Sequence, residues 1–182
     1  MSRDFYELCY DQYKQEMSEA EGLYQKAGVI LVVLPLLGAI MVTLGRLDIL
    51  NLCFIRVDAF LFYLAFFATT LALAASTLFL FLCVYPRKYK TLANMDVWQQ
   101  WRENYQKYLR EKEENPGEDP SALDAAMFVN LCQRLTEAQP INAKINEKRR
   151  MQFKRSVLWA AIAFSAVGVE ALFHLILKLQ GV

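Results

Sequence analysis

The chain has 182 residues, of which 55% are hydrophobic and 21% are charged, and its formal net charge is +1 at pH 7. Its four cysteines are scattered, with no CxxC pair and no Cys/His cluster. Their spacing therefore indicates neither a zinc site nor a disulfide framework. The charged residues lie between long apolar runs, so the composition excludes an ordinary soluble protein and allows one membrane domain with a modest aqueous domain.

Three apolar runs, at residues 27–45, 59–85 and 156–177, determine the fold class. The second run contains no charged residue in 27 positions. A helix needs about 20 apolar residues to cross a hydrocarbon core about 30 Å thick, and soluble core helices rarely stay apolar on all sides for that long. The sequence therefore predicts an all-α integral membrane protein, with three transmembrane helices in contact with the lipid bilayer and a helical cytoplasmic domain.

The distribution of lysine and arginine predicts the orientation in the membrane. Residues 1–26 hold three of them, residues 46–58 hold two, residues 86–155 hold fourteen, and the C-terminal tail holds one. Placing residues 1–26 and 86–155 on the same side gives 17 basic residues against 3. The positive-inside rule then puts both segments in the cytoplasm and the protein in the inner, cytoplasmic membrane.

The domain organisation follows from the apolar runs and the charges between them. We expect a cytoplasmic amphipathic helix at 1–26, a transmembrane helical hairpin at 27–85, a cytoplasmic helical domain at 86–155, and a third transmembrane helix with a short outer tail at 156–182.

The cytoplasmic domain is expected to hold several helices. Apolar spacing predicts a helix over 91–114, and Asn-Pro-Gly-Glu-Asp-Pro at 115–120 predicts a break. A capping-box pattern opens a further helix over 121–138, which Pro140 is expected to end. Residues 141–178 then form one helix of 38 residues, about 57 Å long, which enters the membrane and is suited to act as a lever in gating.

Two features of the membrane helices leave alternatives open. Pro35 in the first span either kinks the helix as a hinge or is one of the prolines that membrane helices commonly tolerate. In the second span, Ala68, Ala72 and Ser76 form a stripe of small residues, which allows close packing either within the chain or against another subunit.

Glu170 and His174 are the candidate polar residues within the membrane. They lie four residues apart on one helical face of the third run, and ionisable residues in membrane spans are costly and often functional. About 21 Å of helix separates Ser156 from Glu170, which places Glu170 in the outer third of the membrane. Glu170 either lines a pore between several copies and attracts cations, or pairs with Arg46 or Arg56. No metal site is expected, because one His and one Glu do not make one.

Basic residues near the predicted membrane boundary and an aromatic helix face form the candidate ligand site. Trp and Tyr recur at positions 98, 101, 105 and 108, on one face of a helix. The basic residues either anchor anionic lipid headgroups, at about 1 kcal/mol per charge, or bind a nucleotide or oligonucleotide whose bases stack on the aromatic side chains. That aromatic face is alternatively a helix-packing surface. The ligand-binding candidates are Lys144, Lys148, Arg149, Arg155, Arg87, Lys88, Trp98 and Trp101.

The run Asn146-Glu-Lys-Arg-Arg-Met-Gln-Phe-Lys-Arg155 enters the third membrane helix from a helical cytoplasmic part. This architecture resembles the small membrane subunits of bacterial anti-phage defence operons, in the style of the SLATT-type effectors and the membrane subunit of the Hailong system. The resemblance implies a homo-oligomer that forms a channel and depolarises the cell when a nucleotide signal is produced or withdrawn.

These observations predict an oligomeric membrane channel or pore-forming effector, gated through its cytoplasmic helices by a nucleotide-type signal in anti-phage defence. Three helices cannot by themselves enclose a water-filled pore, so several copies would have to assemble, most simply in a ring. The alternative is a non-conducting membrane anchor or scaffold that recruits a cytoplasmic protein partner. The sequence carries no catalytic constellation, so neither an enzyme nor a cofactor is expected.

Overall fold

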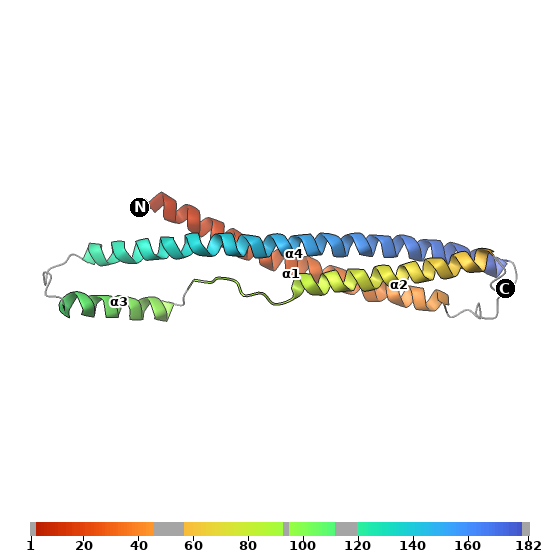
Figure 1. The fold of residues 1–182 in the computed structure, drawn as a ribbon, viewed down its shortest axis with the longest axis horizontal. Helices are drawn as coiled ribbons and strands as arrows, with labels where there is room; N and C mark the ends of the chain where they lie inside the picture. Colours follow the sequence, from red (N-terminus) through yellow and green to blue (C-terminus); the bar gives the residue numbers. More distant parts are fainter. Residues whose placement is uncertain (1–2, 46–56, 93–94, 112–119, 180–182) are drawn as a thin grey trace. The chain divides into compact units, whose positions relative to one another are not determined.

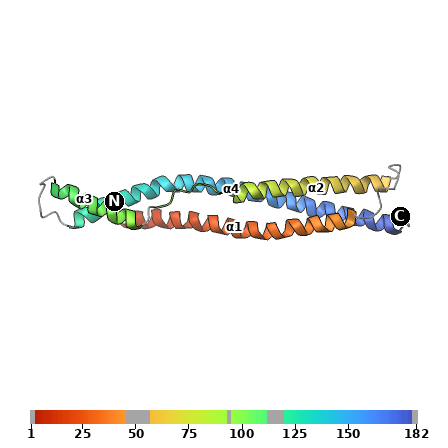
Figure 2. The same cartoon turned by 90° about the horizontal axis from the view of Figure 1, so that it is seen from below.

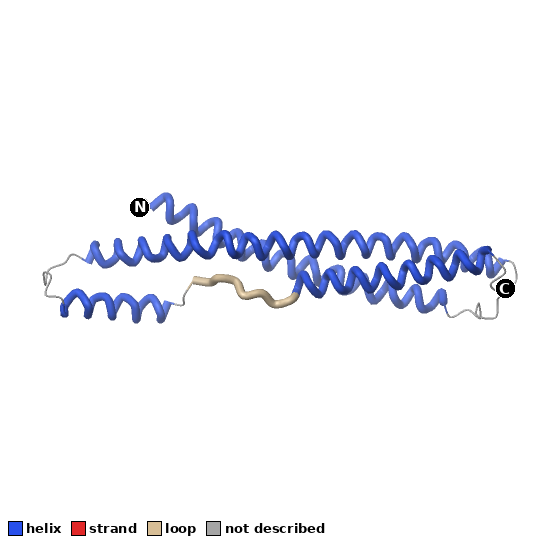
Figure 3. Tube along the Cα trace, viewed as in Figure 1, coloured by secondary structure: helices blue, strands red, loops and turns tan. Residues whose placement is uncertain are grey.

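The computed structural model describes residues 3–45, 57–92, 95–111 and 120–179. Four α-helices account for most of them: α1 (Arg3–Gly45), α2 (Val57–Val84), α3 (Met95–Glu111) and α4 (Pro120–Leu179) (Figure 1). Within the described ranges there is no strand, and the extended segment that follows α2 is drawn as a loop in Figure 3. The predicted all-α membrane fold is confirmed.

The internal contacts of the chain divide it into two compact units. The polar unit comprises Met1–Ala20 and Arg87–Asn146, and the membrane unit comprises Glu21–Pro86 and Glu147–Val182. Helices α1 and α4 contribute residues to both units, whereas α2 belongs to the membrane unit and α3 to the polar unit.

The membrane unit contains three packed helices. Among the described residues, α1, α2 and α4 are long and apolar enough to cross a membrane. Helix α2 lies beside parts of α1 and α4 in both views (Figures 1 and 2). One core cluster takes Ala27 and Leu34 from α1, Leu80 from α2 and Ala160 from α4. Many of the residues that turn outward are large and apolar, Val29, Phe67 and Leu158 among them, so the apolar part of the unit presents a surface suited to lipid.

Helix α2 packs through its small residues. Ala72 and Ser76 are fully buried inside the membrane unit, while Ala68, one turn earlier, is exposed. Small side chains allow helix backbones to approach closely, and in lipid this packing drives helix association. At Ala72 and Ser76 the predicted stripe therefore packs within the chain, and only Ala68 faces outward.

Helix α4 continues through Pro140, so the predicted helix end at this proline is wrong. Proline removes one helical hydrogen bond and crowds the preceding turn, at a cost of about 3 kcal/mol. The proline itself is exposed, and the opposite face is anchored by the buried side chains of Leu135, Ala138 and Asn142. Tertiary contacts on both sides of the proline therefore outweigh its local preference. Most of the predicted break at 115–120 lies outside the described residues.

Helix α1 is likewise continuous. It joins the predicted amphipathic helix and the first apolar run in one helix of 43 residues, with Pro35 inside it and exposed. A hinge at Pro35 stays a prediction. The proposed boundaries at 26, 85 and 155 also stay predictions of where the membrane begins.

Two buried asparagines of α4 hold the extended segment 87–92 in the polar unit. Asn142 accepts from the Lys90 backbone N–H and donates to the Lys90 carbonyl oxygen, both at 2.9 Å. One turn later, Asn146 accepts from the Tyr89 hydroxyl at 2.6 Å and donates to the backbone and carboxylate oxygens of Glu16 on α1, both at 2.7 Å. These bonds satisfy the buried amides and determine the path of the chain ahead of α3.

Candidate functional site

Glu170 lies in the interior of the membrane unit, between α4 and α2. Its side chain is fully buried, and its Oε1 accepts a hydrogen bond from the Thr69 hydroxyl. Its Oε2 is buried and has no hydrogen-bond partner among the described residues. Thr69 stands near the middle of the 28-residue α2, so the contact is remote from both ends of that helix. A carboxyl group in this place is costly in free energy, which marks Glu170 as a functional candidate.

The polar residues that follow Glu170 on the same face of α4 are less buried than Glu170. His174, one turn after Glu170, is half-buried, and its Nδ1 is enclosed without a hydrogen-bond partner in the described part of the chain. Lys178, one further turn on, is exposed. The alternative pairing of Glu170 with Arg46 or Arg56 falls on residues outside the described ranges.

A second polar contact joins the same two helices. The Ser76 hydroxyl donates to the backbone oxygen of Ser156 at 2.8 Å, and the Ser156 hydroxyl donates to the backbone oxygen of Ser76 at 3.0 Å. Both serines are fully buried. Together with the Thr69–Glu170 contact, this pair holds α2 against α4 by polar bonds that lipid cannot replace.

Arg149 is buried within the membrane unit. Its guanidinium carbon lies 4.4 Å from the centroid of the Tyr24 ring, and its Nη2 donates to the Tyr24 hydroxyl and, at 3.4 Å, to the Tyr85 carbonyl oxygen. Only 1% of the residue is exposed. These contacts make Arg149 a link between α1, α4 and the end of α2, and its predicted role in ligand binding stays a prediction.

The remaining basic candidates lie in both units. Lys144, Lys148, Lys88 and Arg155 are exposed, and Arg87 is half-buried. Arg155 also lies over the Phe79 ring, 5.7 Å from its centroid. Of the predicted ligand-binding set, Lys144, Arg87, Lys88, Trp98 and Trp101 belong to the polar unit, and Lys148, Arg149 and Arg155 belong to the membrane unit.

The aromatic side chains predicted for one face of α3 lie on that helix, but they differ in how deeply they are buried. Trp98 is 7% exposed, and the Arg134 guanidinium from α4 lies over its ring at 5.6 Å from the centroid. Further along α3, the Trp101 and Tyr105 rings are stacked with centroids 5.2 Å apart, and Tyr108 follows at 6.3 Å from Tyr105. Trp98 therefore packs against α4, as the helix-packing alternative predicts, while Tyr108 remains largely exposed.

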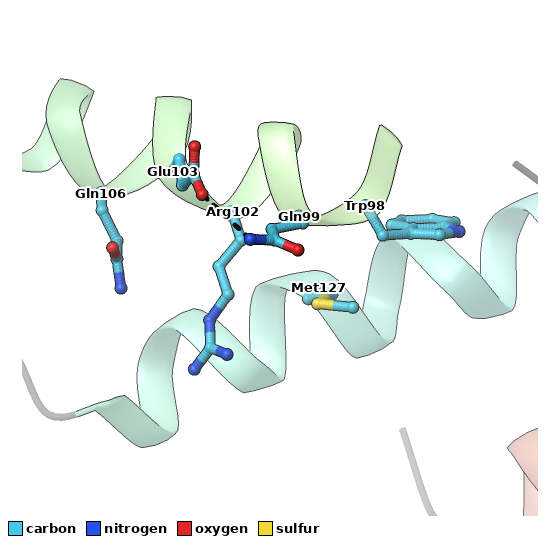
Figure 4. A pocket seen from close by; sticks show the side chains of 6 residues that line it. All are labelled: Trp98, Gln99, Arg102, Glu103, Gln106 and Met127. Atoms are coloured by element: carbon cyan, nitrogen blue, oxygen red, sulfur yellow. Dashed lines mark hydrogen bonds between the residues drawn. The ribbon is translucent and has the colours of Figure 1, made fainter. Parts of the chain in front are cut away.

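A groove of about 420 Å³ lies between α3 and α4 in the polar unit. Figure 4 shows Arg102 reaching from α3 toward α4, with Met127 rising from α4 between Arg102 and Trp98. The Gln99 amide donates to the Glu103 carboxylate at 3.3 Å along one edge. The groove thus combines an apolar floor with a guanidinium, two amides and a carboxylate. Its lining residues are Trp98, Gln99, Arg102, Glu103, Gln106 and Met127.

Residues 10–176 match the family PycTM, described as a Pycsar effector protein domain. The match covers most of the 182-residue chain. The chain belongs to the Pycsar effector family. Neither a curated protein nor a solved structure matches it.

Membership in this family confirms the broad expectation drawn from the architecture. The protein is a multi-pass membrane effector of anti-phage defence. The match does not support an assignment to the SLATT-type effectors or to the Hailong system in particular.

In this Pycsar effector, sequence reasoning missed several residues that the structure brings together. Gln99, Arg102 and Gln106 recur at helical spacing beside the aromatic face of α3, and this polar edge was the available signal for the groove. Asn142 and Asn146 stand four residues apart on α4, a spacing that places them on one face. Their partners are 52 or more residues away in sequence, so the spacing alone did not reveal their role.

Proposed function

We propose that this Pycsar effector is an oligomeric channel or pore of the inner membrane that opens when its polar unit binds a cyclic nucleotide. The family supports a membrane effector of anti-phage defence. The charge distribution supports a cytoplasmic N-terminus and a cytoplasmic segment 86–155. The proposed action moves ions through the membrane and uses neither a catalytic residue nor a cofactor.

Glu170 is the observation that carries this proposal. A carboxyl group in an apolar span is retained at a cost, and here one of its oxygens, Oε2, makes no hydrogen bond with the described residues. In the packed unit the carboxyl group turns toward Thr69 and away from the surface. We assign this arrangement to the closed state. Opening would separate α2 from α4 and turn Glu170 toward a water-filled path shared by several copies.

The Thr69–Glu170 contact provides a direct test of gating. Thr69→Val keeps the shape of the side chain and removes the hydroxyl donor. A hydrogen bond contributes about 0.5–1.5 kcal/mol to a neutral partner and about 1.5–3 kcal/mol to a charged one, so its loss would shift the closed–open equilibrium toward opening by roughly twofold to a hundredfold. In proteoliposomes we expect Thr69→Val to leak ions without any nucleotide. Thr77→Val is the matched control, because Thr77 is exposed and, among the described residues, bonds only the Leu73 carbonyl oxygen within its own helix.

The role of Glu170 in conduction is tested by Glu170→Gln. After addition of each of the four common cyclic mononucleotides, single-channel currents should show a reduced conductance or a weaker cation preference for this variant. Glu147→Gln, on the exposed face of the same helix, should leave both unchanged. Unchanged conductance and selectivity in Glu170→Gln would refute the pore role.

The alternative function is a non-conducting anchor that recruits a cytoplasmic protein. The exposed side chains of Val97 and Tyr108 on α3 favour it, because they offer apolar contact area in the polar unit. A monomer in mild detergent that passes no current with any of the four cyclic mononucleotides, and that loses a co-purifying protein on Trp101→Ala, would replace the channel proposal with this one.

A further inference from the structure

Glu170 lacks the partners that a buried negative charge requires. Its side chain is fully buried in the membrane unit, and its Oε2 makes no hydrogen bond in the described part of the chain. Its Oε1 meets the hydroxyl of Thr69, which carries one hydrogen and also lies 3.0 Å from the Ala65 carbonyl oxygen. From the described residues, a carboxylate here would receive at most one hydrogen, and a carbonyl oxygen would compete for it.

The helices packed around Glu170 supply no charge that would offset a carboxylate. On α4, the enclosed Nδ1 of His174 makes no hydrogen bond within the described ranges, and Lys178 is exposed two turns beyond Glu170. The apolar part of α1, residues 27–45, contains no ionisable side chain. The ionisable side chains of α2 carry no positive charge, and they are Asp58, Tyr63 and Cys83.

We propose that Glu170 is a proton-binding site, and that the packed membrane unit holds its carboxyl group in the neutral, protonated form. Burying an ionised carboxylate without compensation costs far more free energy than burying a neutral carboxyl group, so such a group takes up a proton instead. The neutral group keeps the Thr69 contact, because its Oε1 still accepts a hydrogen bond.

The consequence for gating rests on the proposed function, since it requires Glu170 to meet water when the channel opens. At that point the O–H bond of the carboxyl group breaks, the proton passes to water, and the carboxylate keeps the electron pair. Opening therefore releases a proton from each subunit, so an acidic medium favours the closed state. By linkage, the closed–open equilibrium shifts by up to about tenfold per subunit for each pH unit.

The pH dependence of thermal stability tests the proton site without a current or a nucleotide. Glu170→Gln is neutral at every pH and has nearly the shape of the protonated side chain. As the pH rises from about 5 to about 8, the unfolding equilibrium of the full-length parent in lipid nanodiscs should move toward the unfolded state, by up to about tenfold per pH unit relative to Glu170→Gln. The reason is that the folded parent binds a proton which an ordinary carboxyl group in the unfolded chain has already lost.

Glu147→Gln is the matched control. Glu147 is exposed on the same helix, so its replacement should leave the pH dependence of the parent unchanged. Repeating the comparison in a His174→Gln background removes the neighbouring imidazole, because imidazole groups ordinarily titrate in this range. Infrared spectroscopy gives a readout that does not depend on unfolding: near neutral pH the parent should show the carbonyl band of a neutral carboxylic acid, and Glu170→Gln should lack it.

The outcomes separate the proton site from the proposed function. The same pH dependence in the parent and in Glu170→Gln, or a parent without the carboxylic-acid band, would overturn the proton site even if the protein conducts. A carboxylate paired with Arg46 or Arg56, which lie outside the described ranges, predicts that missing band together with a loss of stability in Glu170→Gln. If the parent shows both the band and the pH dependence but passes no current with any of the four cyclic mononucleotides, the channel proposal fails and the proton site stands.

Discussion

Arg149 and Arg150 are neighbours with the same side chain and different surroundings. Arg149 is 1% exposed, lies on the Tyr24 ring and donates to the Tyr85 carbonyl oxygen, whereas Arg150 is exposed. The planar guanidinium can stack on a ring and donate in fixed directions, while a lysine ammonium in the same place is a point charge. The shape of the side chain therefore matters at 149 in a way that charge alone does not.

The paired substitutions Arg149→Lys and Arg150→Lys test this difference. We expect Arg149→Lys to lower the free energy of unfolding by about 2 kcal/mol or more, because it loses the stacked cation–π contact and a charged hydrogen bond. Arg150→Lys should stay within about 0.5 kcal/mol of the parent. Thermal unfolding in detergent, followed by circular dichroism, measures both. Equal stability of the two variants would contradict the structural role of Arg149.

At the scale of the helix, α2 shows how burial divides one stripe of small residues. Ala72 is fully buried against the other helices of the membrane unit, and Ala68 is exposed one turn away. In lipid, polarity does not distinguish the packed face of a helix from its exposed face, because both faces are apolar. Only the packing of the side chains distinguishes them. The sequence therefore predicted correctly that small residues of α2 allow close packing, but it did not indicate which of the three contact the rest of the chain.

Ala72→Leu and Ala68→Leu separate packing within the chain from contact between copies. Ala72→Leu should destabilise the protein by about 1–3 kcal/mol, because the added carbons have no space in a packed core. Ala68→Leu should leave the thermal stability of the protein unchanged. Measuring the mass of the detergent-solubilised protein adds a second result: dissociation of an oligomer by Ala68→Leu alone would place a subunit contact on the outer side of α2.

Helix α4 shows a second limit of local rules. Pro140 predicted a helix end, yet the helix runs on, because the buried residues around the proline hold both sides of it. The Lys90–Glu137 ion pair at 3.2 Å lies one turn before it, and the hydrogen bond from Lys90 lowers the pKa of the Glu137 carboxyl. Because both side chains are about half exposed, this pair adds little stability, and the buried bonds of Asn142 dominate.

At the scale of the whole molecule, charge and apolar length carry the prediction of topology. The orientation with 17 basic residues inside and 3 outside requires the N-terminus in the cytoplasm and, after three spans, the C-terminus outside. Nothing in the packing of the helices depends on this orientation, so it needs a test of its own.

Reporter fusions to the C-terminus of the full-length chain provide that test. We expect alkaline phosphatase, which is active only outside the cytoplasm, to be active in this fusion, and green fluorescent protein, which folds in the cytoplasm, to be dark. The same two reporters fused to the N-terminus should give the opposite pair of signals. Fluorescence at the C-terminus would overturn the predicted orientation.

The amino-acid sequence determined the all-α class, the three membrane-spanning segments and the presence of one carboxyl group within the third. These depend on local quantities, namely hydropathy summed over about 20 residues and the spacing of apolar side chains. The tertiary structure decided what each polar residue contacts. Glu170 meets Thr69 across 101 positions, and Asn146 meets Glu16 across 130. Partners so far apart are chosen by how the helices pack, and no local pattern in the chain encodes that choice.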